Sequence, residues 1–196
     1  VLQSKPLRFI KDIKQLDLSS YDVVICDYEP ITAWAARQQN KKTIGISHQY
    51  AFQYHIPRAG TDPVSEAVMR NFAPVDIGIG LHWHHFDQPI LPPVIETPII
   101  AQQIQRNKVV IYLPFEDQQQ VMKLLSPFKE FEFFIYSPEN VTSPYAHIHC
   151  KPLSLHGFQK DLSDCTGIIC NAGFELASES LQLGKKILVK PVHAQM

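Results

Sequence analysis

The sequence lacks long runs of basic or apolar residues. Its 196 residues carry a net charge of −1, and no basic run is longer than Lys41-Lys42 or Lys185-Lys186, which argues against binding of a long nucleic acid. No apolar stretch approaches the roughly 18–20 residues of a membrane span. The first residues do not form a signal peptide. A cytoplasmic setting is therefore the expectation.

The chain also contains no C-x-x-C pair, although it has four cysteines. Cys26 and Cys170 lie in apolar, strand-like runs, where a free cysteine behaves as a small hydrophobic residue. This usage argues against a zinc or redox centre. With 45% hydrophobic residues, the chain can bury one good core or two small ones.

Strand-like and helix-like segments alternate through both halves of the sequence. Strands are expected at 23–26, 43–47, 76–81, 109–113, 131–136, 147–150, 167–170 and 187–189. This alternation is typical of parallel sheets, and so of an α/β protein with two Rossmann-like domains. Four prolines between Pro89 and Pro98, followed by a polar segment at 101–108, indicate the boundary. We expect domains at 1–97 and 98–196.

The most informative stretch begins with the apolar run Gly167–Cys170 and breaks at Asn171-Ala172-Gly173. A helical pattern follows from Phe174 to Leu183, and a second apolar run starts at Ile187. The stretch therefore predicts a β-α-β unit with a parallel sheet. Its turn directs the positive end of a helix at a space that a ligand can approach, which favours phosphate binding.

Two glutamates lie on one face of this predicted helix. Glu175 and Glu179 are four residues apart, and Glu179 lies about 9 Å along the helix beyond Gly173. A nucleotide whose diphosphate sits at the helix start would place its ribose near Glu179. An ordinary β-α-β unit with a packing glycine and solvated glutamates is the alternative.

The ordered pattern from Asn171 through Glu179, with Leu183-Gly184 and Pro191, resembles the donor-binding motif of GT-B glycosyltransferases. The likeness is closest to family 28, which includes the N-acetylglucosaminyltransferase that forms lipid II, and to its uncharacterised bacterial and archaeal relatives. The resemblance implies that Glu179 holds the ribose of a UDP-sugar and that Gly173 opens the diphosphate-binding turn.

The resemblance also marks residues outside this motif. It implies that backbone near Leu153 packs on the nucleotide base, and that a glutamine after Pro191, with Gln195 as the match, lies near the donor sugar. The family's loop corresponding to Pro114–Asp117 is rich in glycine, whereas this sequence has none there. The expected donor-binding residues are Leu153, Asn171, Ala172, Gly173, Phe174, Glu175, Glu179 and Gln195.

The first half supplies candidates for the acceptor side. His48 follows the strand at 43–47 and is the candidate general base, because histidine titrates near neutrality; a loop histidine bonded to backbone is the alternative. Gln49 is expected beside it. Asp27 and Glu29 follow the strand at 23–26, where they line a cleft or cap the helix that begins at Pro30.

Two metal-like patterns lie in the same half. Asp27 and Glu29 loosely match the D-x-D metal motif of the other glycosyltransferase fold, GT-A, and His82-Trp83-His84-His85 resembles a metal cluster. Alternate side chains at a strand end diverge, so an aromatic and histidine patch is favoured over zinc. No metal ligand and no cofactor are expected.

The resulting hypothesis is a GT-B glycosyltransferase with two Rossmann-like domains facing a cleft, the first incomplete and the second truncated. It would move a hexosyl or N-acetylhexosaminyl group from a nucleoside diphosphate sugar, with UDP as the expected nucleotide, to an acceptor hydroxyl. Peripheral membrane association of the full-length protein is a further hypothesis. A UDP-sugar epimerase of the same fold, a non-catalytic nucleotide-binding module and a structural interaction protein are the alternatives.

Overall fold

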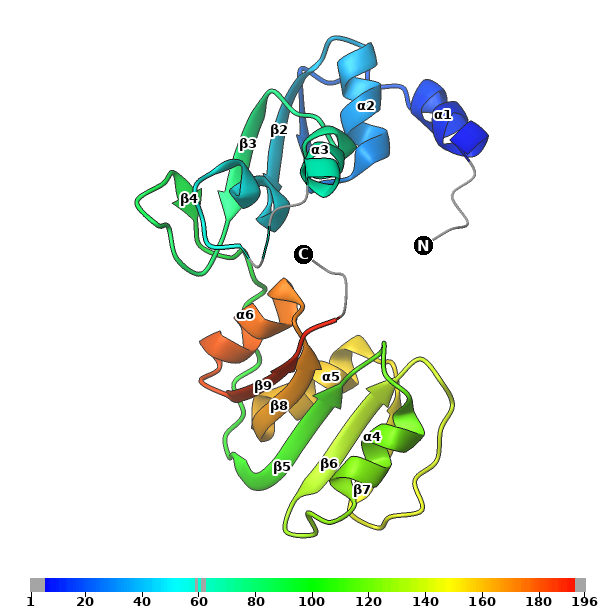
Figure 1. Cartoon of the computed structure of the whole chain (residues 1–196), viewed down its shortest axis with the longest axis vertical. Helices are drawn as coiled ribbons and strands as arrows, with labels where there is room; N and C mark the ends of the chain where they lie inside the picture. Colours follow the sequence, from blue (N-terminus) through cyan, green and yellow to red (C-terminus); the bar gives the residue numbers. More distant parts are fainter. Residues whose placement is uncertain (1–5, 59, 61–62, 193–196) are drawn as a thin grey trace. The chain divides into compact units, whose positions relative to one another are not determined.

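A computed structural model describes residues 6–58, 60 and 63–192. The chain forms two compact units, an N-terminal unit that ends at Val94 and a C-terminal unit that begins at Ile95 (Figure 1). The units therefore divide after Val94, whereas the sequence analysis placed the domain boundary after Thr97. Within the described residues, no helix is long and apolar enough to cross a membrane.

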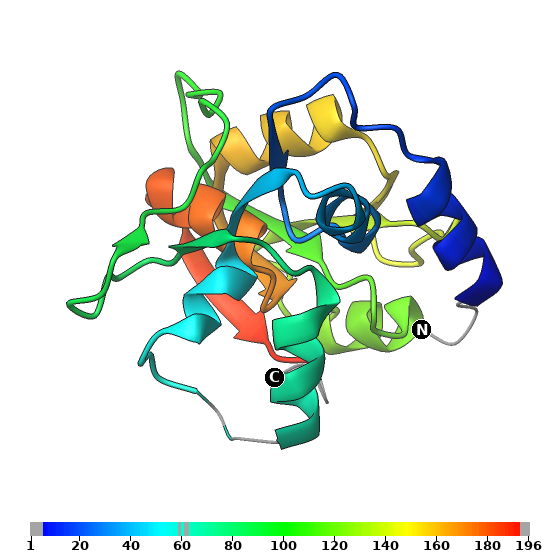
Figure 2. The same ribbon diagram turned by 90° about the horizontal axis from the view of Figure 1, so that it is seen from above.

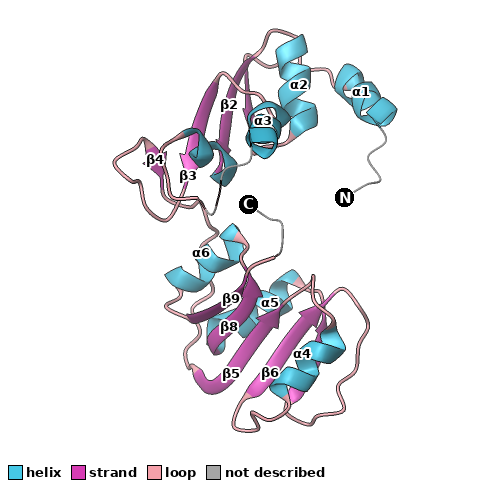
Figure 3. Ribbon diagram, in the orientation of Figure 1, coloured by secondary structure: helices cyan, strands magenta, loops and turns pink. Residues whose placement is uncertain are grey.

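The N-terminal unit is built on a parallel sheet with strand order β1-β2-β3-β4 (Figure 3). Its elements are α1 (Pro6–Gln15), β1 (Val23–Cys26), α2 (Pro30–Gln38), β2 (Lys42–Ser47), the 3-10 helix η1 (His48–Gln53), α3 (Pro63–Phe72), β3 (Ile77–Leu81) and β4 (Ile90–Leu91).

Helix α2 covers one face of this sheet. It begins with Pro30, whose fixed φ suits the first helical position, and three of its alanines are buried, among them Ala35. Val24 of β1 packs against this helix, while the alternate residue Ile25 points to the opposite face and is exposed. Burial on one face only is the pattern of a sheet covered by helices on that side.

Helix η1 lies directly on the sheet because glycine leaves room for it. A Cβ on Gly80 of β3 would lie 2.5 Å from the Cα of Ala51, closer than real side chains allow. Ala51 is fully buried at this contact. The close approach fixes η1, which begins at His48, against the carboxyl end of β3.

The C-terminal unit contains a five-stranded parallel sheet with order β7-β6-β5-β8-β9. This order reverses direction beside β5, as in a Rossmann-like fold. Its elements are β5 (Gln105–Tyr112), α4 (Gln118–Leu125), β6 (Glu132–Ser137), β7 (Ile148–Pro152), α5 (Leu155–Asp164), β8 (Cys165–Asn171), α6 (Phe174–Gln182) and β9 (Lys186–Lys190).

Helices cover both faces of this second sheet. Figure 2 shows α4 on one side of the strands and α5 and α6 on the other. Ile111 and Ile135 pack with α4 on the first face, whereas Val110 and Ile168 pack beneath α5 and α6 on the second. The apolar strands are thus buried on both faces, as expected for a parallel sheet.

Two parts of the segment around the expected boundary belong to strands. Ile90 and Leu91, within the proline-rich stretch, pair with β3 instead of forming a connection. The polar residues Gln105–Lys108 belong to β5, which the sequence analysis expected to begin at Val109. Lys108 is buried in this strand because two acidic side chains pair with it.

Those acids belong to a buried polar network on α5. Lys108 donates to Asp161 at 2.9 Å and also to Asp164. Tyr136 and Lys151 each donate to the second carboxylate oxygen of Asp161 at 2.6 Å. The network ties three neighbouring strands of the sheet to α5.

The β-α-β unit predicted at the end of the chain is confirmed. Strand β8, helix α6 and strand β9 follow one another, and β8 pairs with β9 in parallel. Gly184 has a φ of +65° just after α6, a conformation that glycine adopts without strain and that ends helices. Cys26 and Cys170 are free and buried, as the sequence predicted.

Candidate functional site

The carboxyl ends of β5, β7 and β8 each lead into a helix of the C-terminal unit. Asp117 caps α4, accepting from the backbone N–H groups of Gln119 and Gln120, and Ser154 caps α5. Gly173 occupies the same position on α6 but has no side chain with which to cap it. The positive end of α6 therefore lacks the local side-chain cap that the other two helices have.

The turn before α6 combines one buried residue, Asn171, with two exposed residues, Ala172 and Gly173. Asn171 is only 8% exposed; its Nδ2 donates to the carbonyl of Lys190 at 3.0 Å, and its Oδ1 is buried with no hydrogen-bond partner among the described residues. Ala172 and Gly173 are exposed. A Cβ placed on Gly173 would meet no atom of the described part of the chain within 4 Å, apart from its chain neighbours, so this turn leaves space for a ligand.

A pocket of about 260 Å³ lies beside this turn. Phe158 forms edge contacts with Tyr112 and Tyr136, at ring-centroid distances of 5.8 and 5.1 Å. The volume is slightly below the roughly 300–1,000 Å³ of small-molecule sites, so the pocket suits part of a ligand. Its lining residues are Tyr112, Tyr136, Leu153, Ser154, Leu155, Phe158, Glu175, Leu176 and Glu179.

Glu179 provides the half-buried carboxylate in this pocket. Burial raises its pKa, and the nearby charges of Glu175 and Glu96 raise it further. Because desolvation disfavours the charged form, a partner that donates hydrogen bonds to the carboxylate is favoured at this position. Glu96 itself accepts from Gln159 at 3.1 Å.

The structure brings together several of the residues expected to bind the donor. Leu153, Glu175 and Glu179 line one pocket, and Asn171–Phe174 form the neighbouring turn and helix start. Gln195 lies outside the described residues.

The aromatic residues of the pocket were missed by the sequence analysis. Tyr112 ends β5 and Tyr136 lies near the end of β6, so their positions at the carboxyl ends of strands were the available signal. Phe158 lies within α5. Its aromatic character alone fits a core position equally well, so only the folded arrangement places it at the pocket.

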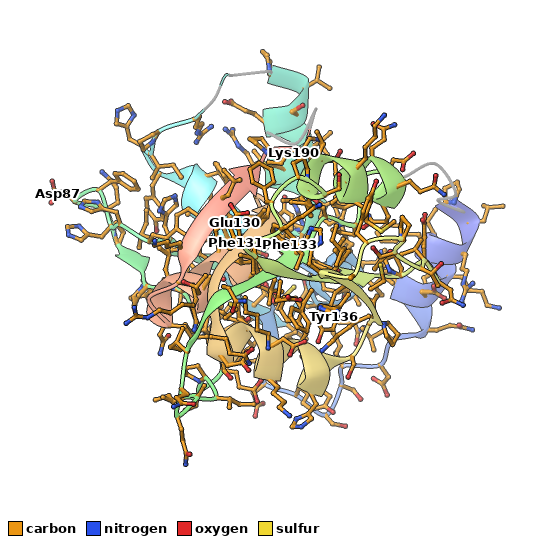
Figure 4. All side chains as sticks on the ribbon, turned by 90° about the horizontal axis from the view of Figure 1, so that it is seen from below. Asp87, Glu130, Phe131, Phe133, Tyr136 and Lys190 are labelled. Carbon is orange, nitrogen blue, oxygen red and sulfur yellow. The ribbon has the colours of Figure 1, made fainter. Side chains whose placement is uncertain are left out.

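A charged pair crosses the same edge of the sheet. Lys190 ends β9 and is paired in register with Asn171. Its Nζ forms an ion pair with Glu116, which lies in the loop between β5 and α4. The pair therefore spans β8, the strand between β5 and β9. Figure 4 labels Lys190.

In the N-terminal unit, His48 begins η1 at the end of β2. Its Nδ1 lies 2.9 Å from the carbonyl oxygen of Leu81. Its ring contacts Phe52 and His82, with centroids 5.2 and 5.4 Å away. Burial lowers the pKa of His48, and the hydrogen bond to Leu81 offsets part of that shift.

The other acceptor-side candidates have distinct surroundings. Glu29 is the N-cap of α2, and its two oxygens accept from the N–H groups of Ile31 and Thr32 at 2.9 and 2.7 Å, which matches the capping alternative. Asp27 is exposed after β1. Gln49 hydrogen-bonds with the hydroxyl of Ser47 and lines a separate pocket of about 510 Å³.

The histidine patch after β3 does not form a metal cluster. His84 and His85 stack with centroids 4.8 Å apart, and His82 contacts Phe86. Across the described part of the chain, no group of three or more histidine, cysteine or acidic residues is arranged to hold a metal ion. The patch consists of histidine and aromatic rings in contact with one another.

Larger hollows lie elsewhere. A pocket of about 800 Å³ is lined by Val23, Lys42 and Ile77, among others. These residues begin β1, β2 and β3, so this hollow lies at the amino ends of the strands. Ligands of parallel α/β sheets bind at the carboxyl ends, and we therefore place the candidate site at the smaller pocket of the C-terminal unit.

Comparison with known proteins identifies the family. The profile of glycosyl transferase family 1 matches residues 5–196. The chain belongs to this family. Among solved structures, the glycosyltransferase SnogD from Streptomyces nogalater matches with a TM-score of 0.53 and 13% identity, over 87% of this chain and 55% of SnogD. The spinosyn forosaminyltransferase SpnP matches with a TM-score of 0.57 and 11% identity, over 95% of this chain and 61% of SpnP.

The search of curated proteins found no match to this chain. Identities of 11–13% show a shared fold, so the expected α/β fold of the GT-B type is confirmed. The matching family is family 1; the likeness to family 28 and to the lipid II-forming enzyme remains a prediction. The chain spans 55–61% of the length of the two solved structures.

Proposed function

We propose that this chain takes part in transfer of a sugar from a nucleoside diphosphate sugar to an acceptor hydroxyl, with the donor bound by the C-terminal unit. The observation that carries the proposal is Glu179, a carboxylate in an aromatic-lined pocket on the helix that Gly173 starts. Membership of glycosyl transferase family 1 supports the reaction class.

In this proposal the nucleotide extends from the pocket to the start of α6. The base packs between the Leu153 backbone and the ring of Phe158; both residues line the pocket. The vicinal ribose hydroxyls donate to the two oxygens of Glu179, and the diphosphate lies at Gly173, where helix N–H groups favour anions. UDP is the nucleotide, and a hexosyl or N-acetylhexosaminyl group is the sugar.

The transfer itself is a displacement at the anomeric carbon of the sugar. The acceptor hydroxyl oxygen forms a bond to that carbon while the bond to the diphosphate oxygen breaks. The hydroxyl proton passes to His48, and the diphosphate leaves with the electron pair of the broken bond. The positive end of α6 stabilises the charge that develops on the leaving diphosphate.

His48 has a tautomer suited to this step. A carbonyl oxygen can only accept, so the contact with Leu81 requires the proton on Nδ1. In the neutral ring, Nε2 is then the basic nitrogen. Because burial lowers the pKa of His48, the neutral form predominates at pH 7 and Nε2 can accept a proton.

The experiment that tests donor binding is Glu179→Ala. A hydrogen bond to a charged group is worth about 1.5–3 kcal/mol, so loss of the carboxylate should weaken UDP binding by at least roughly ten- to a hundred-fold. Isothermal titration calorimetry with UDP measures the change. Glu175→Ala, one turn earlier on the same helix, is expected to cost less.

Glu130→Ala is the charge-matched control, since Glu130 is an exposed glutamate of the same unit (labelled in Figure 4) and does not line the pocket. Its UDP affinity should equal that of the wild type. If Glu179→Ala binds UDP with unchanged affinity and has an intact circular dichroism spectrum, α6 has no role in nucleotide binding and is an ordinary helix of a β-α-β unit.

We also propose that the reaction needs no metal ion, because the start of α6 and nearby side chains supply the charge stabilisation. Transfer by the full-length protein should retain its rate in excess EDTA. If EDTA abolishes activity and Mg²⁺ or Mn²⁺ restores it, a metal ion stabilises the leaving diphosphate.

Product analysis separates the remaining alternatives. An epimerase would convert a UDP-sugar in the absence of an acceptor, whereas a transferase needs both substrates. A non-catalytic module would bind UDP without turnover. Incubating the full-length protein with UDP-sugars alone, and then with candidate acceptors, distinguishes these three outcomes.

A further inference from the structure

We infer that Lys190 binds the diphosphate of the donor and that Glu116 holds this lysine ready for it. This inference rests on the proposed function, because it assigns a residue to the same site. Lys190 would be the binding residue. Glu116 would be a positioning residue that pairs with it while the site is empty.

The position of Lys190 is set by the sheet. The strand register places it beside Asn171, the residue that precedes the open Ala172-Gly173 turn. Its carbonyl accepts the Asn171 amide at 3.0 Å, so its backbone is tied to the start of that turn. Its side chain crosses the end of β8 to reach Glu116, and it therefore passes over the edge where the diphosphate is proposed.

Binding of a diphosphate at the carboxyl ends of β5, β8 and β9 requires a positive group, because acidic residues lie in the adjoining segments. In the segments 113–117, 171–175 and 189–192, the acidic residues are Glu116, Asp117 and Glu175, and Lys190 is the only lysine or arginine. A diphosphate placed among three carboxylates would be repelled without a positive group. Lys190 can supply that group as a compact charge with three donors.

The existing ion pair is of a kind that can exchange partners. The Lys190 side chain is 51% exposed and that of Glu116 is 21% exposed, so water screens the pair and it contributes little to stability. A diphosphate carries more negative charge than one carboxylate and offers several oxygens. Lys190 would therefore move from Glu116 to the phosphate oxygens when the donor binds.

The test compares UDP with uridine, which lacks the phosphates, by isothermal titration calorimetry on the wild-type chain and on Lys190→Gln. Loss of a charge-assisted hydrogen bond predicts about ten-fold weaker UDP binding, with uridine binding unchanged. Lys190→Arg should restore most of the UDP affinity. Lys186→Gln, at the other end of β9, is the matched control and should behave like the wild type.

Glu116→Gln is expected to change UDP affinity in the opposite direction. Removing the carboxylate frees Lys190 and removes a negative charge near the diphosphate, so UDP should bind up to about five-fold more tightly, the magnitude expected for an exposed ion pair. A purely structural ion pair would instead give Glu116→Gln and Lys190→Gln the same small loss of thermal stability and no opposite changes in affinity.

The outcomes separate the two proposals. If the wild type binds UDP, and Glu179→Ala weakens it, but Lys190→Gln leaves UDP affinity unchanged, the inference about Lys190 is overturned while the donor site stands. If the wild type does not bind UDP at all, the proposed function fails and this inference fails with it. Equal weakening of uridine and UDP by Lys190→Gln would also overturn a phosphate-specific role.

Discussion

His48→Ala is expected to lower kcat of sugar transfer by about 10²–10⁴-fold, the range for removal of a general base. UDP affinity should not change, because His48 is not among the residues that line the proposed nucleotide pocket. Steady-state kinetics of the full-length protein, together with titration of UDP, measure both effects.

The pH dependence gives an independent readout of the same residue. The base must be neutral to accept a proton, so the rate falls as the pH drops through the pKa of His48. Since burial lowers that pKa, the acidic limb should lie below the ordinary histidine value of about 6.5. In His48→Ala this limb should disappear.

His55→Ala is the matched control, because His55 is an exposed histidine shortly after η1. It should keep kcat within about two-fold, as expected for a surface substitution. A His48→Ala enzyme with wild-type kcat and an unchanged acidic limb would remove His48 from the mechanism.

Asp161→Asn is expected to lower the free energy of unfolding by about 3 kcal/mol, the lower end of the range for breaking a buried ion pair. The carboxylate accepts from Lys108, Lys151 and Tyr136 within hydrogen-bond distance. Asparagine offers those donors one oxygen and no charge. Lys108 keeps Asp164 as a second partner, which limits the loss. Urea unfolding measures the difference.

The same group gives a pH dependence of stability. Burial alone raises the pKa of Asp161, but hydrogen bonds from Lys151, Tyr136 and Lys108 outweigh it, and the net pKa is lowered. A carboxyl group with a lowered pKa in the folded state stabilises the fold above its unfolded value of about 3.9. That stabilisation is lost as the pH falls through the folded pKa, and Asp161→Asn should lack this acid-dependent loss.

Asp117→Asn serves as a control with the same chemical change. Asp117 is an exposed N-cap, and asparagine caps helices about as well as aspartate. Its unfolding free energy should stay within about 0.5 kcal/mol of the wild type, as for other surface substitutions. Equal stability losses in both variants would mean that the Asp161 network contributes no more than an exposed cap.

The sequence was most informative where local chemistry and fold agree. The apolar run into Asn171, the small residues of the turn and the stop at Gly184 specify strand, turn and helix by rules that act over a few residues. Helical spacing then placed Glu175 and Glu179 on one face, and both line the pocket. These predictions needed no knowledge of distant contacts.

Features that depend on distant partners could not be predicted in this way. The sequence alone does not predict that Lys108 is buried in a strand. The two acidic residues that pair with it, Asp161 and Asp164, follow more than fifty positions later. The two-residue strand β4 exists because β3 pairs with it. The Lys190–Glu116 pair likewise joins residues that only the sheet order brings together.

In the proposed function, the pocket beside α6 holds a nucleotide. The most direct measurement is a titration of the isotope-labelled chain with UDP, followed by amide NMR shifts. The largest shifts are expected at Leu153, Phe158, Gly173 and Glu179, and they should be weaker in Glu179→Ala. Shifts confined to the hollow at the amino ends of β1–β3, lined by Val23, Lys42 and Ile77 among others, or no shifts at all at millimolar UDP, would contradict it.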